Sequence, residues 1–140
     1  MARDITTKIV RKVATIDEHC STLDAAILMT EEFIGSVVVT SSSGITGIFT
    51  ERDLMMKVVG KKKDPDKQKI KDMMTTTLIR VSPKDTPGDC LDLMKEHRCR
   101  HLLVYTNEEF VGIVSLRDIV ALLIDEKEEL IRDLEKYILS

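Results

Sequence analysis

The sequence repeats itself at a fixed shift of 65 residues, and this repeat constrains the fold more than any other feature. Residues 14–54 align with residues 79–119 without a gap, and nine of the 41 aligned pairs are identical. Composition alone would give about two or three identical pairs over this length. The chain therefore divides into two related units. The identical pairs are Asp24/Asp89, Leu28/Leu93, Met29/Met94, Glu31/Glu96, Val39/Val104, Gly47/Gly112, Ile48/Ile113, Arg52/Arg117 and Asp53/Asp118.

Both copies carry the same order of local signals, which predicts a β-α-β-β-α order. Each has a short extended segment, a helix that opens with the spacing of a capping box, two apolar strands divided by turn-forming residues, and a second helix. The first copy has Ser21 and Asp24 at its capping positions, and the second has Thr86 and Asp89. We expect extended segments at 14–17 and 79–82, strands at 36–40, 45–50, 101–105 and 110–115, and second helices that start at Thr50 and Ser115.

Each copy is too small to bury the face of its own sheet. We therefore expect an α/β fold in which the two repeats pack face to face as a pseudo-twofold pair. The segment that joins them begins with charged residues and ends in the apolar-rich run 70–74. This pattern indicates a segment that is anchored and not free.

The pattern after the second repeat predicts a C-terminal helix extension that reaches Ile138. An apolar stripe follows this helix, and Ile124, Ile131 and Ile138 have the spacing of a heptad. The stripe could pack back onto the chain's own sheet. A helix that outlasts the repeat favours a dimerisation element instead, and hence a homodimer.

The composition excludes several classes of protein. The formal net charge is −3, so overall charge does not recruit nucleic acid or an acidic membrane surface, and the short basic stretch 61–63 is interpreted as solvated linker. No window approaches the roughly 20 apolar residues that span a bilayer, and the N-terminus lacks the apolar core of a signal peptide. We therefore expect a cytoplasmic protein.

Cysteine and histidine usage argues against a disulfide framework or a metal site. Cys20, Cys90 and Cys99 are odd in number and have no CxxC spacing, so they are interpreted as small core residues. His97, Cys99 and His101 alternate, but His97 is expected at a helix end and no fourth ligand is evident. No metal and no required cofactor are predicted.

Two β-α-β-β-α units, each of which closes with Gly-h-h-[Ser/Thr]-x-x-Asp (h apolar), resemble the CBS (cystathionine-beta-synthase) domain pair. The matching segments are 47–53 and 112–118, and 71–75 resembles the family's usual entry into its second repeat. The resemblance covers about residues 8–125 and is closest to stand-alone pairs. It implies repeat 1 at 8–60, a linker at 61–76, repeat 2 at 77–125 and a C-terminal helix at 126–140.

The resemblance implies regulation without chemistry on the ligand, so no enzymatic activity is expected. CBS pairs bind adenosine-containing ligands such as AMP, ATP or S-adenosylmethionine in clefts between their repeats, and they commonly dimerise. The expected function is a regulatory module that binds such a ligand and modulates an unknown partner protein. The alternative is a structural dimerisation module with empty clefts.

The Ser/Thr-x-x-Asp element has two explanations. Thr50 with Asp53, and Ser115 with Asp118, fit a capping box that stabilises a helix start by about 1 kcal/mol. By resemblance the Asp of the second motif holds the ribose hydroxyls, since a carboxylate accepts both protons of a diol, and the Ser or Thr contacts ribose or phosphate. We favour a dual role.

Basic residues near this element distinguish the two repeats. Arg52 and Arg117 occupy the first helical turn, where a cation opposes the helix dipole, so we expect an anionic partner that is either a phosphate or a carboxylate. Arg100 and His101 lie at the start of the central strand of repeat 2, and the resemblance assigns them to the better phosphate site. A surface ion pair is the simpler role for Arg100. Adenine is expected among the apolar strand residues Ile16, Ile79 and Val81.

Overall fold

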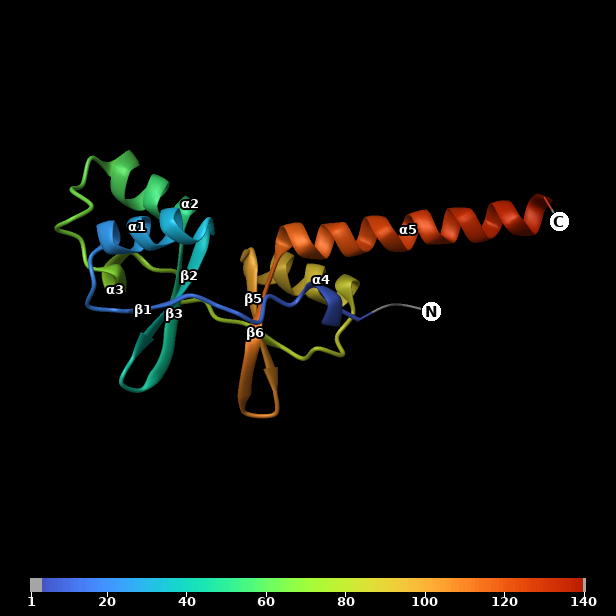
Figure 1. Cartoon of the computed structure of the whole chain (residues 1–140), viewed down its shortest axis with the longest axis horizontal. Coiled ribbons are helices and arrows are strands. Elements are labelled where there is room, and N and C mark those ends of the chain that lie inside the picture. The colour runs from blue at the N-terminus through green and yellow to red at the C-terminus, as the bar shows by residue number, and fades with distance from the viewer. Residues whose placement is uncertain (1–3, 140) are drawn as a thin grey trace. The chain divides into compact units, whose positions relative to one another are not determined.

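The computed structural model describes residues 4–139 and divides them into two compact units. The unit that contains the first repeat comprises residues 13–78. The unit that contains the second repeat comprises residues 79–139 together with the N-terminal segment 4–12. The mixed α/β class, the two repeats and the C-terminal helix expected from the sequence are confirmed (Figure 1).

The first-repeat unit has a three-stranded sheet in the order β1-β2-β3. Strand β1 is parallel to β2, and β2 is antiparallel to β3. The helical turn α2 passes directly into a π-helical turn, η2, so the second helix of this repeat is irregular from its fourth residue onward. The elements are β1 (Thr15–Asp17), α1 (Thr22–Glu32), β2 (Ser36–Ser41), β3 (Gly44–Thr50), α2 (Glu51–Asp53), η2 (Leu54–Val58), η3 (Val59–Lys61) and α3 (Ile70–Met73).

The second-repeat unit has the same topology, with a sheet in the order β4-β5-β6. Strand β4 is parallel to β5, and β5 is antiparallel to β6. Here the second helix is a single α-helix of 24 residues. The elements are η1 (Thr6–Lys8), β4 (Arg80–Val81), α4 (Pro87–His97), β5 (His101–Thr106), β6 (Glu109–Ser115) and α5 (Leu116–Leu139).

The first helix of each repeat begins where its capping residues predict. In α1, Ser21 Oγ accepts from Asp24 N at 3.0 Å, and Ser21 N donates to Asp24 Oδ2 at 3.1 Å. In α4, Thr86 Oγ1 accepts from Asp89 N at 3.2 Å, and Pro87 occupies the first helical turn. Each cap satisfies a helix N–H group that has no partner within the helix.

A segment from outside each repeat adds a short antiparallel bridge to the last strand of each sheet. Thr75 bridges Ile48 on β3, and Val10 bridges Ile113 on β6. Ile48 and Ile113 are counterparts in the 65-residue repeat, so the two bridges occupy equivalent positions. The N-terminal segment 4–12 thus belongs to the second-repeat unit. The boundary of repeat 1 that the family resemblance implies, residue 8, assigns residues 8–12 to the first repeat instead. The end of the joining segment belongs to the first-repeat unit, where Ile70 is fully buried.

Gly47 and Gly112, the first residues of the two repeated motifs, lie in close contact with the segments that form these bridges. A Cβ on Gly112 would overlap the carbonyl oxygen of Val10, and a Cβ on Gly47 would lie 2.9 Å from that of Thr75. Both distances are shorter than van der Waals contact. Glycine is therefore required at both positions by the close approach of a second backbone.

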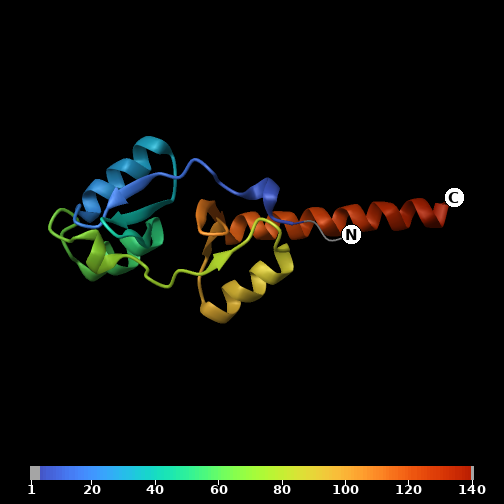
Figure 2. The same ribbon diagram turned by 90° about the horizontal axis from the view of Figure 1, so that it is seen from below.

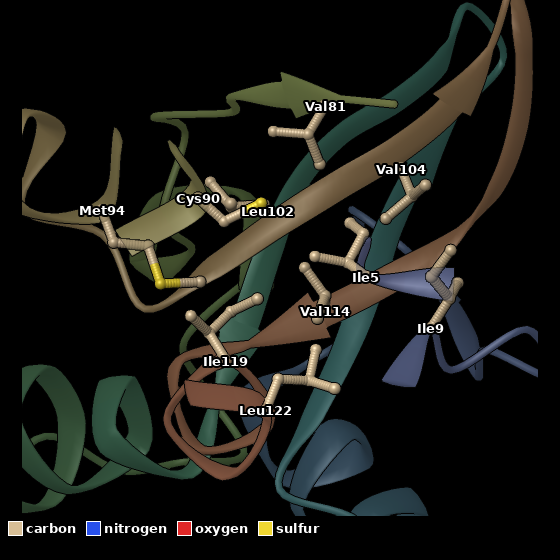
Figure 3. Packing of buried hydrophobic residues seen from close by; sticks show 10 residues of the cluster. All are labelled: Ile5, Ile9, Val81, Cys90, Met94, Leu102, Val104, Val114, Ile119 and Leu122. Atoms are coloured by element: carbon tan, nitrogen blue, oxygen red, sulfur yellow. The ribbon is translucent and has the colours of Figure 1, made fainter. Parts of the chain in front are cut away.

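Each unit has its own hydrophobic core. In the first-repeat unit, Val37, Val39 and Phe49 from the sheet pack with Ala25 and Met29 of α1. In the second-repeat unit the side chains converge from the sheet, α4, the start of α5 and the N-terminal segment (Figure 3). These side chains are Ile5, Ile9, Val81, Cys90, Met94, Leu102, Val104, Val114, Ile119 and Leu122.

The cysteines pack as small core residues, as predicted. Cys90 is fully buried, and Cys99 and Cys20 pack against the core of their own unit. Burial raises the pKa of the Cys90 thiol to about 11, with smaller contributions from the carboxylates of Asp85 and Asp89. Burial also raises the pKa of Cys99.

Helix α5 continues well beyond the core of its unit. Its buried residues are Ile119 and Leu122, both near its start. A helix of 24 residues is about 36 Å long, and both views show α5 continuing as a straight rod past α4 (Figures 1 and 2). Large apolar side chains on the projecting part, among them Ile124, Leu130, Ile131 and Leu134, are half exposed or more.

Candidate functional site

The second-repeat unit contains six of the nine predicted ligand-binding residues, and five of them lie around the start of α5. His101 pairs with Ser115 across β5 and β6, and Leu116 N donates to Arg100 O at 2.8 Å. Arg117 and Asp118 follow in the first turn of α5. Ile79 lies on the other side of β5, since Leu103 N donates to Ile79 O at 2.9 Å, and it packs partly buried against the core.

Asp118 is held in place by Ser115, and part of its carboxylate remains open. Ser115 N and Ser115 Oγ both reach Asp118 Oδ2, at 3.4 Å and 3.0 Å, and Asp118 N donates to Ser115 Oγ at 3.2 Å. Among the described residues, the first two are the only hydrogen bonds of the Asp118 side chain, and neither reaches Oδ1. The cap therefore orients the carboxylate and leaves one oxygen able to accept from a ligand.

The first-repeat unit gathers the other three predicted residues, Thr50, Arg52 and Asp53, at the start of α2. The backbone arrangement is equivalent, because Glu51 N donates to Gly35 O at 2.9 Å as Leu116 N does to Arg100 O. Thr50 N donates to Asp53 Oδ2 at 3.0 Å, and Asp53 N donates to Thr50 Oγ1 at 3.1 Å. Both repeats thus have the predicted cap.

Asp53 differs from Asp118 in its further partners. Lys57 Nζ lies 3.0 Å from Asp53 Oδ1, and Thr75 Oγ1 lies 3.1 Å from Oδ1 and 3.2 Å from Oδ2. Lys57 Nζ also donates to Met73 O at 3.1 Å. Asp53 is 7% exposed. Groups of the protein itself therefore satisfy both oxygens of this buried carboxylate.

The counterparts of these partners in the second-repeat unit are apolar. Lys57 corresponds in the repeat to Leu122, which is buried in the core. Thr75 corresponds to Val10, since the two residues bridge equivalent strand positions. Neither counterpart can donate a hydrogen bond from its side chain, so the two aspartates of the repeated motif have different surroundings.

The predicted arginines remain on the surface of their own units. Arg52, Arg100 and Arg117 are exposed, and none of them forms an ion pair with a residue in the range 4–139. The surface ion pair considered for Arg100 is therefore not formed within the described chain. The positive charge at the start of α5 is available to an external anion.

Sequence reasoning missed Lys57 and Thr75. Lys57 lies four residues after Asp53, a spacing at which opposite charges on a helix meet, and its counterpart in the other repeat is a leucine. That comparison could have found Lys57. Thr75 is 22 residues from Asp53 in the sequence, and no local pattern connects them.

Within residues 4–139, no group of three or more His, Cys, Asp or Glu side chains could hold a metal ion. No helix in the same range is long and apolar enough to cross a membrane.

Comparison with known protein families gives a match over both repeats. The model of the CBS domain matches residues 2–60 and again residues 70–125. These two ranges contain all nine of the predicted ligand-binding residues.

Individual relatives agree with this match. The chain is 32% identical to the mitochondrial CBS domain-containing protein CBSX3 of Arabidopsis thaliana, over 82% of this chain and 58% of the relative. It is 34% identical to the uncharacterized protein YlbB of Bacillus subtilis, over 79% of this chain and 78% of the relative. A solved structure of a putative signal-transduction protein with CBS domains from Burkholderia ambifaria superposes with a TM-score of 0.75 at 34% identity, and covers 82% of this chain and 85% of that one.

Proposed function

Because the chain belongs to the CBS-domain family, we propose that it is a non-catalytic regulatory module that binds an adenosine-containing ligand of the AMP, ATP or S-adenosylmethionine class. The observation that carries this proposal is that Asp118 Oδ1 accepts no hydrogen bond from residues 4–139, at a helix start whose first residue, Leu116, bonds to the backbone of the exposed Arg100. The location of the ligand between the two repeats stays a prediction from the family resemblance.

The residues around the start of α5 have the chemistry that such a ligand requires. The carboxylate of Asp118 accepts protons from the two ribose hydroxyls, and Ser115 fixes its orientation. Arg100 and Arg117 offer guanidinium groups to a phosphate or a carboxylate. Partly buried Ile79 offers an apolar surface to the adenine ring.

Regulation follows if the ligand has different affinities for two arrangements of the chain or of its assembly. A ligand that binds both arrangements equally shifts nothing, however tightly it binds. The module would then bias a partner protein in the cytoplasm, the location expected from the sequence.

The proposal is tested by thermal unfolding of the purified protein with AMP, ADP, ATP, S-adenosylmethionine and NADH at millimolar concentration. A ligand present at about 100 times its Kd stabilises a folded protein by roughly 2.7 kcal/mol, which raises the unfolding temperature by several degrees. We expect at least one of the first four ligands to do so. The absence of a shift with all of them contradicts the proposal.

A second candidate function, a structural dimerisation module, is favoured by the exposed stripe on α5. Together with Lys127, five apolar residues of α5 follow the alternating spacing of four and three residues that two packed helices share, and all five are exposed: Val120, Ile124, Ile131, Leu134 and Ile138. We propose that a second copy of the chain covers this stripe. Both functions predict a dimer, and binding of an adenosine ligand distinguishes them.

A further inference from the structure

The two Ser/Thr-x-x-Asp motifs of this chain do not have equal capacity for a ligand. We propose that the first motif is closed by the protein's own side chains, so that the chain binds one adenosine ligand, at Asp118. This inference rests on the proposed function and specifies which of its two motifs is used.

The lone pairs of Asp53 are already engaged. A carboxylate offers about four lone-pair positions for hydrogen bonds. Thr50 N donates to Oδ2, Lys57 Nζ donates to Oδ1, and the single hydroxyl proton of Thr75 lies between both oxygens, so three donors occupy the carboxylate. A ribose diol needs two of these positions and would have to displace Lys57 or Thr75.

Displacement from Asp53 would be costly, because the site is buried. Asp53 is 7% exposed. Leaving a buried polar group without its partner costs more free energy than the hydrogen bond contributes to the stability of the folded protein. Lys57 Nζ also donates a hydrogen bond to Met73 O, so its position does not depend on Asp53 alone. Asp118, by contrast, receives its hydrogen bonds from Ser115 at Oδ2 alone among the described residues.

The charge beside the first motif is also unsuited to a phosphate. The carboxylate of Glu51 lies over Gly35, since a Cβ on Gly35 would be 3.0 Å from Glu51 Oε1. The corresponding residues of the second motif are Leu116 and Arg100. At these two positions the first motif has an anion and the second has a cation, while Arg52 and Arg117 are common to both, and an anion at close range opposes the binding of a phosphate.

Isothermal titration calorimetry of the full chain with AMP, ATP and S-adenosylmethionine, each titrated separately, tests the inference. We expect one ligand per chain. Asp118→Asn should weaken binding by about tenfold or more, because the amide supplies one acceptor oxygen in place of two. Asp53→Asn should lower the unfolding temperature while the number of ligands bound stays at one.

A combined variant gives the first motif the surroundings of the second. Glu51→Leu, Lys57→Leu and Thr75→Val introduce the residue types of Leu116, Leu122 and Val10. We expect this variant to bind more than one ligand per chain, because Asp53 regains open lone pairs. If Asp53→Asn does not fold, the combined variant still tests whether the first motif is closed. A number that stays at one in this variant overturns the closing role of Glu51, Lys57 and Thr75.

The outcomes separate this inference from the proposed function. Two ligands per wild-type chain, or loss of binding in Asp53→Asn but not in Asp118→Asn when both are folded, overturns the inference and leaves the function standing. A wild-type chain that binds none of the three ligands overturns both.

Discussion

Val10 and Thr75 occupy equivalent positions on two different sheets, although they lie 65 residues apart and outside the strands of either repeat. Val10 exchanges backbone hydrogen bonds with Ile113 at 2.8 Å and 3.1 Å, and Thr75 does so with Ile48 at 2.9 Å and 2.8 Å. A segment outside each repeat therefore extends the sheet of each unit: the end of the joining segment at β3, and the N-terminal segment at β6. The N-terminal segment completes the second-repeat unit, where Ile5 is fully buried.

Gly112→Ala tests the importance of the bridge at Val10. The added methyl group would overlap the Val10 carbonyl, and the bridge would have to shift or break. We expect the free energy of unfolding in urea to fall by about 1–3 kcal/mol, which is typical of overpacking. Gly88→Ala in the first turn of α4 is the matched control, because its Cβ would meet no atom closer than 4.0 Å. Equal stability of the two variants would show that the bridge contributes nothing.

The elements of each repeat could be predicted from the sequence because their signals are local. Ser21 and Thr86 cap the helices that they were expected to cap, and the apolar runs became β2, β3, β5 and β6 within one residue at each end. Alternation, turn residues and caps all act over a few positions. The same reasoning located Thr50, Asp53, Ser115 and Asp118 at two equivalent helix starts.

The sequence did not predict which segment completes which sheet or which aspartate is already occupied. Both depend on contacts between residues far apart in the chain, such as Val10 with Ile113 and Asp53 with Thr75. The buried face of α1 was also not evident. Leu23 and Ile27 have helical spacing but are exposed. The buried face of α1 consists of Thr22, Ala25 and Met29, because the face of a helix that is buried is the one that packs on the sheet.

Thr22→Val tests how the joining segment is anchored. Thr22 is fully buried, and its Oγ1 donates to Pro65 O at 2.6 Å. Valine preserves the shape but removes one of the two donors to this carbonyl, which also accepts from Leu23 N at 3.0 Å, so we expect a loss of about 0.5–1.5 kcal/mol. We expect faster tryptic cleavage after Lys61, Lys62 and Lys63. Thr30→Val is the control, since Thr30 Oγ1 donates within its own helix to Ala26 O on the surface. Equal cleavage rates in both variants would contradict the anchoring.

The raised pKa of Cys90 predicts a loss of stability in alkali. The unfolded thiol ionises near its ordinary pKa of 9.0, whereas the folded thiol keeps its proton until about pH 11. Between these values the folded state binds more protons than the unfolded state, so stability falls as pH rises. Because each pKa unit corresponds to about 1.4 kcal/mol, the loss amounts to at most roughly 3 kcal/mol.

Urea unfolding between about pH 8 and pH 11 measures this loss, with Cys90→Ala as the control. The variant is expected to be less stable at neutral pH, because the deletion leaves a small cavity, and to lose less stability as the pH rises. Parallel pH profiles for the two proteins would show that the ionisation of Cys90 is not linked to unfolding.

Lys127→Leu tests whether a second copy covers the stripe on α5. Lys127 lies in the stripe three residues after Ile124 and four before Ile131, and it lines a shallow apolar hollow with Val120, Ile124 and Leu130. A lysine at such a position lowers the stability of a helix pair. Leucine should therefore tighten self-association by about tenfold or more, since a buried leucine contributes roughly 1.5–3 kcal/mol. Sedimentation equilibrium measures the dissociation constant.

Two further variants distinguish the stripe from a general effect of hydrophobicity. Lys136→Leu adds the same side chain on the opposite face of α5, so it should leave the dissociation constant unchanged. Ile131→Lys places a charge in the middle of the stripe and should shift the protein toward the monomer, because a charge buried without a partner is strongly unfavourable. If Lys127→Leu and Ile131→Lys both sediment as the wild type does, the stripe is not the contact between copies, and α5 must be covered by something else.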